Sequence, residues 1–595
     1  MILCGITIPS SLIASSVEEF SFIDLFTAPW VFIVRLFLQL TGIFVWLIVL
    51  YFLFSRIVRQ SVTLLLFIAS IIMITQAFFV SEDFGFITNT LIFSDPKGFE
   101  AFSGNAIISI LLFAAALGIP LLLYVTKKKK IILWIQTISL IAIATMSAVN
   151  CIGIERGFAT ATAKQKTAAT TNSDDVEKIY HLSKDGNNVI LIMLDCVVGS
   201  YIPYMFEERQ DLLDSFTGFT LYKNTVSFAN HTLIGALPIY GGYEYTPKAV
   251  NNRTDATLLE KQTEAYLMLP TLFANAGYAV TVTDPPFDNR QLSNLSIFDS
   301  DKRITATNLS GKYTSQWFKR HDEVKAISVS DILLKKLIRF SFFKSSPLFL
   351  RPFLYDDGQW LMLKDNADSG ITATILNDYV LLDMLPNLSE VQDGIGTYNC
   401  VYVHLPHGTT HLSAPNYDLA NSGGSAGNMI LSDDERYQMT FASFLLLKQW
   451  FDFLKANDVY DNTRIVLVSD RGRGNANYPE NIALPDGNNL QSYNALLMVK
   501  DFDSRTNTAF SVDNTFMTNA DVALFVAKDI ASKNPFTANE LSADKESGVF
   551  VTTIGALSTY RHGKYGYNIN TDQWLYVNKN IFDKDNWKNW NHFNE

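Results

Sequence analysis

The first 155 residues contain four long apolar runs, at 31–54, 61–80, 106–125 and 131–154. Each has about the 20 residues that a helix needs to cross the hydrocarbon core of a bilayer. Residues 1–14 form a shorter apolar stretch with neither a basic flank nor a small-residue cleavage site, so a secretory signal is not indicated. We predict that residues 1–155 form a transmembrane domain of about five helices, of which the first is short or starts upstream.

Basic residues in the loops predict the orientation of these helices. Arg56 and Arg59 lie between the second and third predicted helices, and residues 127–130, all lysine, lie between the fourth and fifth. Both loops should be cytoplasmic, because short loops rich in Lys and Arg stay on that side. The last helix then runs outward, and everything after Glu155 is extracytoplasmic. The membrane domain could be only an anchor, or it could also bind lipid.

Composition excludes several classes of protein. A chain of 595 residues is too long for one ordinary domain. A net charge of -11 argues against a nucleic-acid partner, because domains that bind nucleic acid are usually basic. The four cysteines have no paired spacing, so they indicate neither a disulfide scaffold nor a zinc knuckle.

The chain after the membrane domain has the pattern of an α/β protein. Residues 156–186 are polar and rich in Ala and Thr, and we interpret them as a juxtamembrane linker. Strand-like runs follow within 187–595 and alternate with helical patterns; they lie at 187–195, 218–228, 278–284, 398–405, 463–470 and 494–500. The clearest helix spans 432–457 and begins with the capping box Ser432-x-x-Glu435. Alternating strands and helices predict a sandwich around a mostly parallel sheet.

Polar residues with catalytic potential follow the predicted strands. Asp195 and Asp470 each end a strand, and His407 and His411 come shortly after the run at 398–405. Thr232 opens a probable helix after the second strand, although a threonine there can also be a simple cap. Ligands of α/β sheets gather at the carboxyl ends of the strands, so these side chains are candidates for one site.

The residue types at these positions favour a metal site. Carboxylate oxygens suit Mg²⁺ or Mn²⁺, and histidines extend the range to Zn²⁺. A divalent ion would lower the pKa of the Thr232 hydroxyl and neutralise a phosphoryl group under attack.

Several segments, in order, resemble the sulfatase-like alkaline phosphatase superfamily. They are VILIMLD, HTLIGALPIYGG, VHLPHGTTHLSAP and VLVSDRG, after an N-terminal set of membrane helices. Within that superfamily the chain is similar to membrane-anchored lipoteichoic acid synthases and phosphoethanolamine transferases. The resemblance implies a multi-pass protein of the bacterial cell membrane. It would move a phosphoglycerol or phosphoethanolamine group from a phospholipid donor to a cell-surface glycan or lipid acceptor.

The same resemblance implies roles for individual residues. Asp195, Thr232 and Asp470 match metal ligands of the family, and Thr232 also matches its nucleophile. His411, with His407 as the second choice, matches a histidine that contacts the substrate's phosphate. The formylglycine motif of true sulfatases is absent at Thr232.

One position departs from the family pattern. Arg471 follows Asp470 where the resemblance implies a metal-binding histidine. In one interpretation, His231, His404 or His407 completes the metal site and the enzyme is active. In another, the Arg471 guanidinium holds the phosphate bidentately in the metal's place, and the protein is a catalytically inactive binder of phospholipid or glycan. A third interpretation is a drifted copy without a selected function at this site.

Overall fold

The computed structural model of this chain divides into two compact units. Unit 1 comprises Met1–Thr170, Ser328–Asn366 and Ala556–Thr559, and unit 2 comprises Thr171–Ile327, Ala367–Gly555 and Tyr560–Glu595. The structure describes residues 1–17, 20–21, 28–80, 91, 104–168, 176–286, 295–318, 320–321, 324, 326–327, 329–356, 360–361, 371–419, 431, 433–474, 480–502, 504–554 and 563–590.

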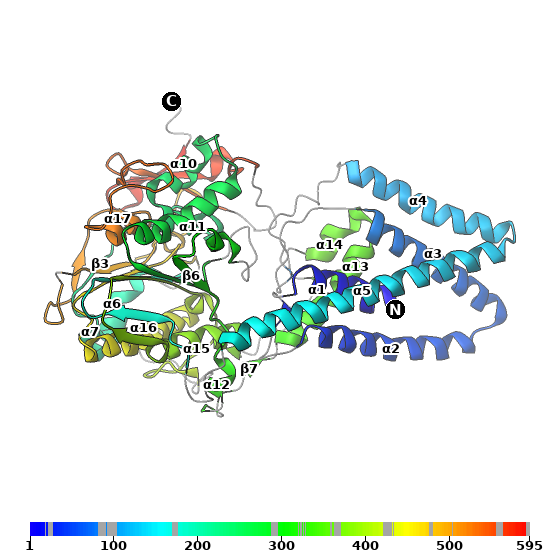
Figure 1. The fold of residues 1–595 in the computed structure, drawn as a ribbon. Coiled ribbons are helices and arrows are strands. Elements are labelled where there is room, and N and C mark those ends of the chain that lie inside the picture. The colour runs from blue at the N-terminus through cyan, green and yellow to red at the C-terminus, as the bar shows by residue number, and fades with distance from the viewer. Residues whose placement is uncertain are drawn as a thin grey trace. The chain divides into compact units, whose positions relative to one another are not determined.

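Unit 1 contains four helices that are long and apolar enough to cross a membrane (Figure 1). They are α2 (Trp30–Leu53), α3 (Arg56–Phe79), α4 (Gly104–Val125) and α5 (Lys129–Ala168). These helices confirm the four predicted spans. The short first stretch is also helical, as a π-helical turn at Leu3–Thr7 followed by α1 (Ile8–Ser15). Much of α2 is exposed although it is apolar, as expected for a surface that faces lipid.

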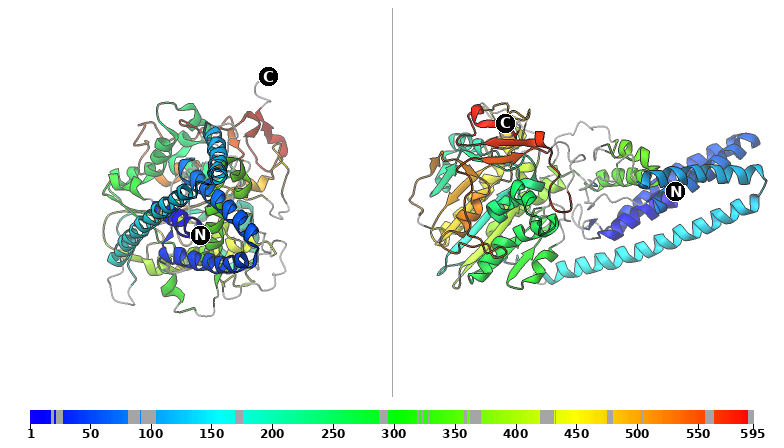
Figure 2. Two further views of the ribbon diagram at one scale, coloured as in Figure 1. Left: turned by 90° about the vertical axis from the view of Figure 1, so that its right-hand side faces the viewer. Right: turned by 90° about the horizontal axis from the view of Figure 1, so that it is seen from above.

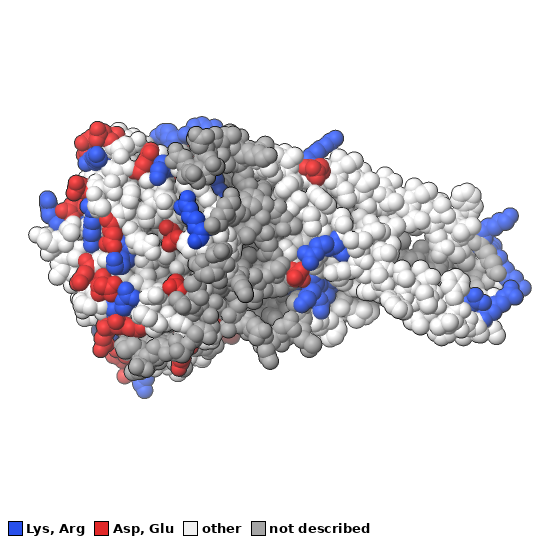
Figure 3. Space-filling view, turned by 90° about the horizontal axis from the view of Figure 1, so that it is seen from below, with Lys and Arg blue, Asp and Glu red and all other residues white. Residues whose placement is uncertain are grey.

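The two basic loops lie at the same end of unit 1. Figure 1 shows the α2–α3 and α4–α5 turns together at the right-hand end of the helices. Lys and Arg gather at that end of the surface in Figure 3, and the surface next to them is uncharged. The loops at 16–28 and 81–103, which carry acidic residues and are expected on the outer side, lie mostly outside the described residues.

Unit 1 also contains a later part of the chain. Helix α13 (Val329–Ser345), a 3-10 turn at Leu348–Leu350 and α14 (Arg351–Tyr355) pack with the membrane helices. The sequence predicted one domain for the whole of 187–595, whereas the contacts group Ser328–Asn366 with unit 1.

The core of unit 2 is an eight-stranded sheet with the order β13-β3-β12-β11-β2-β10-β5-β6. Strands of unit 2 are seen among its helices in Figure 2. Its strands are β2 (Asn188–Leu194), β3 (Phe219–Tyr222), β5 (Ala279–Thr283), β6 (Ile304–Thr307), β10 (Thr397–Val403), β11 (Thr463–Val468), β12 (Leu497–Lys500) and β13 (Ser511–Asp513). Only β12 pairs antiparallel to its neighbours within this sheet as described; the other pairings are parallel. The expected α/β fold with a mostly parallel sheet is confirmed.

Helices cover both faces of the sheet. Those on one face include α6 (Ile202–Glu208), α7 (Gln210–Ser215), α15 (Ala373–Leu388) and α16 (Glu435–Ala456). Those on the other face include α9 (Leu237–Gly241), α11 (Leu258–Asn275) and α17 (Asp521–Ala527). All seven residues of β2 are buried, which explains why this central strand has an unbroken apolar sequence. Each large apolar side chain buried here stabilises the fold by about 1.5–3 kcal/mol.

Two local predictions need correction. The strand expected at 218–228 is divided into β3 and a short β4 (Thr225–Val226), which pairs with β14 (Met517–Thr518) in a separate two-stranded sheet. The helix expected at 432–457 begins at Glu435, and its N-cap is Asp434. The Asp434 carboxylate accepts hydrogen bonds from the backbone N–H groups of Arg436 and Tyr437. Ser432, the expected cap, lies outside the described residues.

A smaller antiparallel sheet completes unit 2. It consists of β15 (Val549–Thr552), β16 (Trp574–Val577) and β17 (Trp587–Asn589). Its apolar side chains form a separate hydrophobic cluster with β4 and the residues around Leu490.

Candidate metal centre

Three adjacent parallel strands bring the site together. In the order β11-β2-β10, Asp470 lies two residues after β11, Asp195 directly after β2, and His404 directly after β10. Because these strands run in the same direction, their carboxyl ends meet at one edge of the sheet. Sequence position and strand order together therefore predict that the three side chains are neighbours, and the structure shows it.

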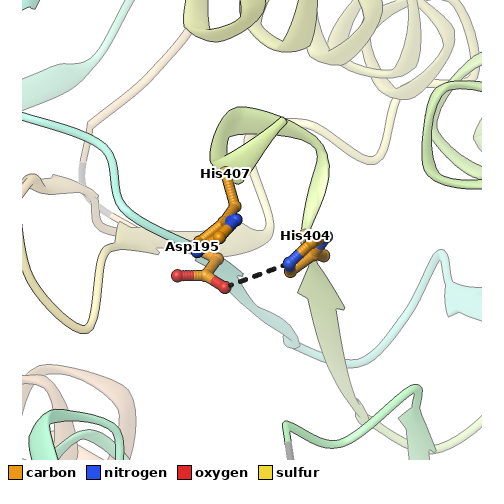
Figure 4. Close-up of side chains that lie close together, drawn as sticks. All are labelled: Asp195, His404 and His407. Atoms are coloured by element: carbon orange, nitrogen blue, oxygen red, sulfur yellow. Dashed lines mark ion pairs between the residues drawn. The ribbon is translucent and has the colours of Figure 1, made fainter. Parts of the chain in front are cut away.

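Asp195 is the centre of the cluster. Its Oδ2 accepts a hydrogen bond from the Tyr402 hydroxyl at 2.9 Å, and its Oδ1 accepts one from the Cys196 thiol at 3.0 Å. The Thr232 hydroxyl lies 3.5 Å from Asp195 Oδ1. His404 Nε2 lies 3.7 Å from Asp195 Oδ2, as Figure 4 shows. The carboxylate is buried and therefore depends on these partners for its stability as an anion.

The two histidines after β10 complete a set of donors that could hold a metal ion. One ligand atom each from Asp195, His404 and His407 lies within 4.8 Å of the others. His404 Nδ1 is 3.2 Å from Asp378 Oδ2, so the second ring nitrogen is the one that faces Asp195. A carboxylate behind a ligating histidine is the usual means of fixing its tautomer and ring orientation. The rings of His404 and His407 stack with centroids 4.6 Å apart.

A second group of donors shares Asp195. Asp195, Cys196 and Asp470 also place ligand atoms within 4.8 Å of one another. Asp470 is fully buried, and its Oδ1 accepts a hydrogen bond from the Cys196 backbone N–H at 3.1 Å. Its Oδ2 has no hydrogen-bond partner within the described parts of the chain. A buried carboxylate oxygen without a donor calls for a cation, so the residues fit a divalent ion.

Arg471 lies beside the same oxygen. Its Nε is 3.5 Å from Asp470 Oδ2 and 3.5 Å from the Thr232 hydroxyl, and its side chain is only 12% exposed. The guanidinium therefore neutralises part of the negative charge where the family pattern has a histidine. Its other N–H donors keep the fork geometry that binds phosphate oxygens bidentately.

Burial and the neighbouring charges shift the pKa values of Asp195 and Asp470 in opposite directions. Burial acts to raise the pKa of Asp195, but His407, His404 and then Arg471 outweigh it and hold that pKa below its usual range. Burial, followed by the negative charge of Asp195, raises the pKa of Asp470 to about 7. Of the two, Asp195 is the carboxylate that stays ionised at neutral pH, so it is the stronger ligand for a cation.

The histidines also differ in charge. Burial acts to lower the pKa of His404, but the Asp378 hydrogen bond and the charge of Asp195 raise it above its ordinary value. Burial lowers the pKa of His407 to about 3. His407 is therefore neutral at neutral pH and has a free lone pair, which is the form that binds a metal.

Thr232 is not the cap of its helix. The N-cap of α8 (Thr232–Gly235) is His231, whose Nδ1 accepts the Leu233 backbone N–H at 3.3 Å. The Thr232 hydroxyl is thus available to face Asp195 and Arg471. Burial lowers the pKa of His231 to about 4, which keeps its ring neutral and able to accept this bond.

His411 has a different environment from His407. Its Nε2 is 3.0 Å from Glu435 Oε1 at the start of α16, and the side chain is 41% exposed. Of the two histidines predicted to bind the substrate's phosphate, His407 is the one that lies in the donor cluster.

Several residues of the site were not predicted from the sequence, Cys196 among them. Tyr402 lies inside β10, and only the alternation of side chains along that strand could have placed it on the Asp195 side. Asp378 comes from the middle of α15 and has no local signal. Arg473 donates to the backbone carbonyl of His407 at 2.7 Å, and its position two residues after Arg471 was the available hint.

No family model matches the sequence, and no curated protein matches it. Solved structures of similar fold include a protein in the alkaline phosphatase superfamily from Vibrio parahaemolyticus, at 11% identity over 71% of this chain and 88% of that one, with a TM-score of 0.37. Another is the lipoteichoic acid synthase LtaP from Listeria monocytogenes, at 13% identity over 66% of this chain and 85% of that one, with a TM-score of 0.33. A third is the C-terminal periplasmic domain of EcEptC from Escherichia coli, at 10% identity over 64% of this chain and 91% of that one, with a TM-score of 0.31. All three identities are below 25% and all three TM-scores are below 0.5, so these likenesses carry no conclusion about the activity of this chain.

Proposed function

We propose that this chain is a membrane-bound phosphotransferase of the bacterial cell envelope. It moves a phosphoglycerol or phosphoethanolamine group from a phospholipid donor to a surface glycan or lipid, with Thr232 as the nucleophile and a divalent metal as cofactor. The observation that carries the proposal is the Thr232 hydroxyl, 3.5 Å from the buried Asp195, which with the partly buried His404 and His407 forms a group that could hold a metal.

The residues divide the work of such a transfer. A divalent ion, most simply Mn²⁺ or Mg²⁺ and with Zn²⁺ suited to the two histidines, would supply charge for the phosphoryl oxygens. Asp195, His404 and His407 would hold it, with Asp470 as a further carboxylate. Asp195 orients the Thr232 hydroxyl through the contact at 3.5 Å.

The chemistry proceeds in two displacements. Thr232 Oγ attacks the phosphorus of the phospholipid, the bond from phosphorus to the diacylglycerol oxygen breaks, and diacylglycerol leaves with a proton. The head group is then a phosphodiester on Thr232. A hydroxyl of the acceptor attacks the same phosphorus, the bond from phosphorus to Thr232 Oγ breaks, and the proton of the acceptor hydroxyl passes to Thr232 Oγ, which restores the threonine. Arg471, whose Nε is 3.5 Å from Thr232 Oγ, stabilises the negative charge that develops in both steps.

The position of Arg471 also supports a second candidate function. Its guanidinium lies against Asp470 Oδ2, the carboxylate oxygen that a metal would otherwise neutralise. If the arginine takes that role alone, the site binds a phospholipid head group or a phosphorylated glycan without activating Thr232. The protein is then a catalytically inactive binder.

Metal-dependent release of the labelled head group from phosphatidylglycerol separates the two functions. The assay uses the full chain in detergent with added Mn²⁺, and chelator and Thr232→Ala serve as controls. An Arg471→His variant is run beside the native chain. Turnover by the native chain that is lost in Thr232→Ala supports the transferase. Turnover by the Arg471→His variant alone supports the binder, and silence of both with phosphatidylethanolamine as well contradicts the transferase.

The predicted orientation belongs to the same proposal. Because both basic loops lie at one end of the membrane helices, we infer that this end is cytoplasmic and that unit 2 is extracytoplasmic. A cysteine placed at Ile395, which is 63% exposed in unit 2, should react with a membrane-impermeant maleimide in intact cells. Reaction only after the cells are opened would contradict this orientation.

A further inference from the structure

We propose that residues 329–355, which return to unit 1 from the middle of the later sequence, form an interfacial segment that binds an anionic phospholipid surface. The segment comprises α13, the 3-10 turn and α14. It leaves unit 2 after β7 (Ala326–Ile327) and the chain re-enters at β8 (Ile371–Thr372), which pairs parallel with β7. The proposal does not depend on the reaction at Thr232.

The segment contacts the membrane helices near their ends. Asp331 forms an ion pair at 2.7 Å with Arg35, which lies five residues after the start of α2. The Leu348 backbone N–H donates to Ser109 Oγ at 3.0 Å, five residues after the start of α4. Arg351 Nη2 donates to the Gln76 carbonyl at 3.1 Å, three residues before the end of α3. At about 1.5 Å per residue, all three contacts lie within about 8 Å of a helix end, the depth of the membrane–water interface.

These ends are the ones away from the basic loops. The contacts involve the beginning of α2, the end of α3 and the beginning of α4, whereas the basic turns follow the end of α2 and the end of α4. Figure 1 shows α13 and α14 beside α1 and α3, away from the right-hand end of the helices. The segment therefore belongs to one interface only.

Its inner face is fixed by packing and by a polar network. Leu337 and Phe340 of α13 are buried in a cluster with residues of α1, α2 and α3. Gln76 Nε2 donates to the Ser109 carbonyl at 2.9 Å, and Ser109 Oγ donates to Gln76 Oε1 at 2.7 Å. The Leu348 N–H then completes the bonding of Ser109 Oγ. Polar groups at membrane depth must be satisfied within the protein, so this network indicates that the segment is an integral part of unit 1.

The exposed side chains of the segment include basic and aromatic ones. Phe342, Phe349 and Phe353 are 46%, 61% and 67% exposed. Lys335 and Arg339 precede Phe342 at helical spacing, so they share its face of α13. Three exposed phenylalanines would be unfavourable in water, whereas aromatic rings are favoured at the level of the lipid head groups. Basic side chains beside them are attracted to anionic head groups. Since the segment adjoins helices that cross the membrane, the lipid surface is the occupant that both features fit.

Spin-label accessibility of the full chain in bilayers tests the proposal. The label is attached to Phe353→Cys and, as a matched exposed control in unit 2, to Ile395→Cys, which replaces a residue that is 63% exposed. The native chain, labelled in parallel, gives the background from its own cysteines. We expect collisions with oxygen to exceed those with a water-soluble nickel complex several-fold at position 353, and the reverse at position 395.

Bilayers of phosphatidylcholine alone are compared with an equal mixture of phosphatidylcholine and phosphatidylglycerol. The label at 353 should move deeper in the mixture, and the double variant Lys335→Gln/Arg339→Gln should abolish that shift. The same aqueous accessibility at 353 as at 395 would overturn the proposal. Low accessibility of position 353 to both reagents that rises when the protein is diluted would also overturn the proposal, because it would mean that a second copy of the chain covers this face. Equal depth in both bilayers would overturn the preference for anionic lipid.

Discussion

Gly472→Ala should damage the site through the backbone. Gly472 follows Asp470 and Arg471 directly, and a Cβ at this position would lie 1.8 Å from the Gln491 carbonyl oxygen and 3.0 Å from that of Asn494. Side-chain carbons essentially never approach within 3.0 Å of such an atom, so the two backbones must separate by about 1.2 Å. Both are held close to strands of the central sheet, β11 on one side and β12 on the other. The displacement is therefore passed on to Asp470 and Arg471.

The expected cost has two parts. Overpacking at a buried position lowers the free energy of unfolding by about 1–3 kcal/mol. A displacement of about 1 Å at reacting groups can cost about 10²-fold in rate, so release of the labelled head group should fall by that order. Thermal unfolding of the full chain in detergent measures the first part, and the release assay measures the second.

Gly474→Ala is the matched control in the same turn. Among the described residues, the added Cβ would meet the Ser492 hydroxyl alone, at 2.8 Å, and that side chain can rotate away. The control should therefore keep its unfolding temperature and activity near those of the native chain. If Gly472→Ala behaves like Gly474→Ala in both assays, the turn is not rigidly held and the reasoning is refuted.

Other substitutions test the surroundings of the metal and a buried acid away from it. Asp378→Asn should weaken binding of Mn²⁺ or Zn²⁺ by about 10–100-fold, because it alters the partner 3.2 Å from His404 Nδ1; an unchanged affinity in calorimetric titration would exclude His404 as a ligand. Tyr402→Phe should lower the free energy of unfolding by about 1.5–3 kcal/mol through loss of its 2.9 Å bond to Asp195, and an unchanged urea midpoint would contradict this. Burial raises the pKa of Asp284 to about 7, despite backbone hydrogen bonds to its carboxylate, so the native state keeps a proton there that the unfolded state loses near pH 4. Asp284 therefore lowers the free energy of unfolding as the pH rises from about 4 to 7, and Asp470 contributes a fall of the same sign. Asp284→Asn, which suits the residue's φ of 48°, should make that fall shallower and gain about 1–2 kcal/mol at pH 8 after allowance for partial exposure; the same pH dependence in both chains would refute it.

The sequence predicted which residues end the central strands, but it did not predict which strands lie side by side or which other residues reach the site. The unbroken apolar runs before Asp195 and Asp470 identified two central strands, because a strand buried on both faces has no polar positions. The order β11-β2-β10 brings these aspartates beside His404. It depends on how the connections between strands cross over the sheet, and no local sequence pattern indicates it. Asp378 could not be predicted for the same reason, since it reaches the site from the middle of a covering helix.

Two failures have a common physical origin. The run at 218–228 was interpreted as one strand by its alternation, but the chain turns after Tyr222 and pairs β4 with β14 in another sheet. The segment at 329–355 was included without distinction in the outer domain at 187–595, and it has no apolar run of membrane-spanning length that would have set it apart. In both cases the local pattern is compatible with several environments, and tertiary contacts decide between them.

The arginine at 471 and the histidines after β10 are parts of one arrangement. A histidine at position 471 would donate a lone pair to a metal near Asp470, whereas the guanidinium can only supply positive charge there. If position 471 after β11 supplies no ligand, other residues near Asp195 must supply it, because Asp195 belongs to both groups of possible metal ligands. His404 and His407 stand on the β10 side, where Asp378 fixes the orientation of the first ring and the low pKa of the second leaves it neutral. Asp195, His404 and His407 would hold a metal there, with the Arg471 charge beside Thr232. The arginine is therefore compatible with catalysis only if the histidines bind the metal, so a chain that turns over substrate should lose that activity when either histidine is replaced.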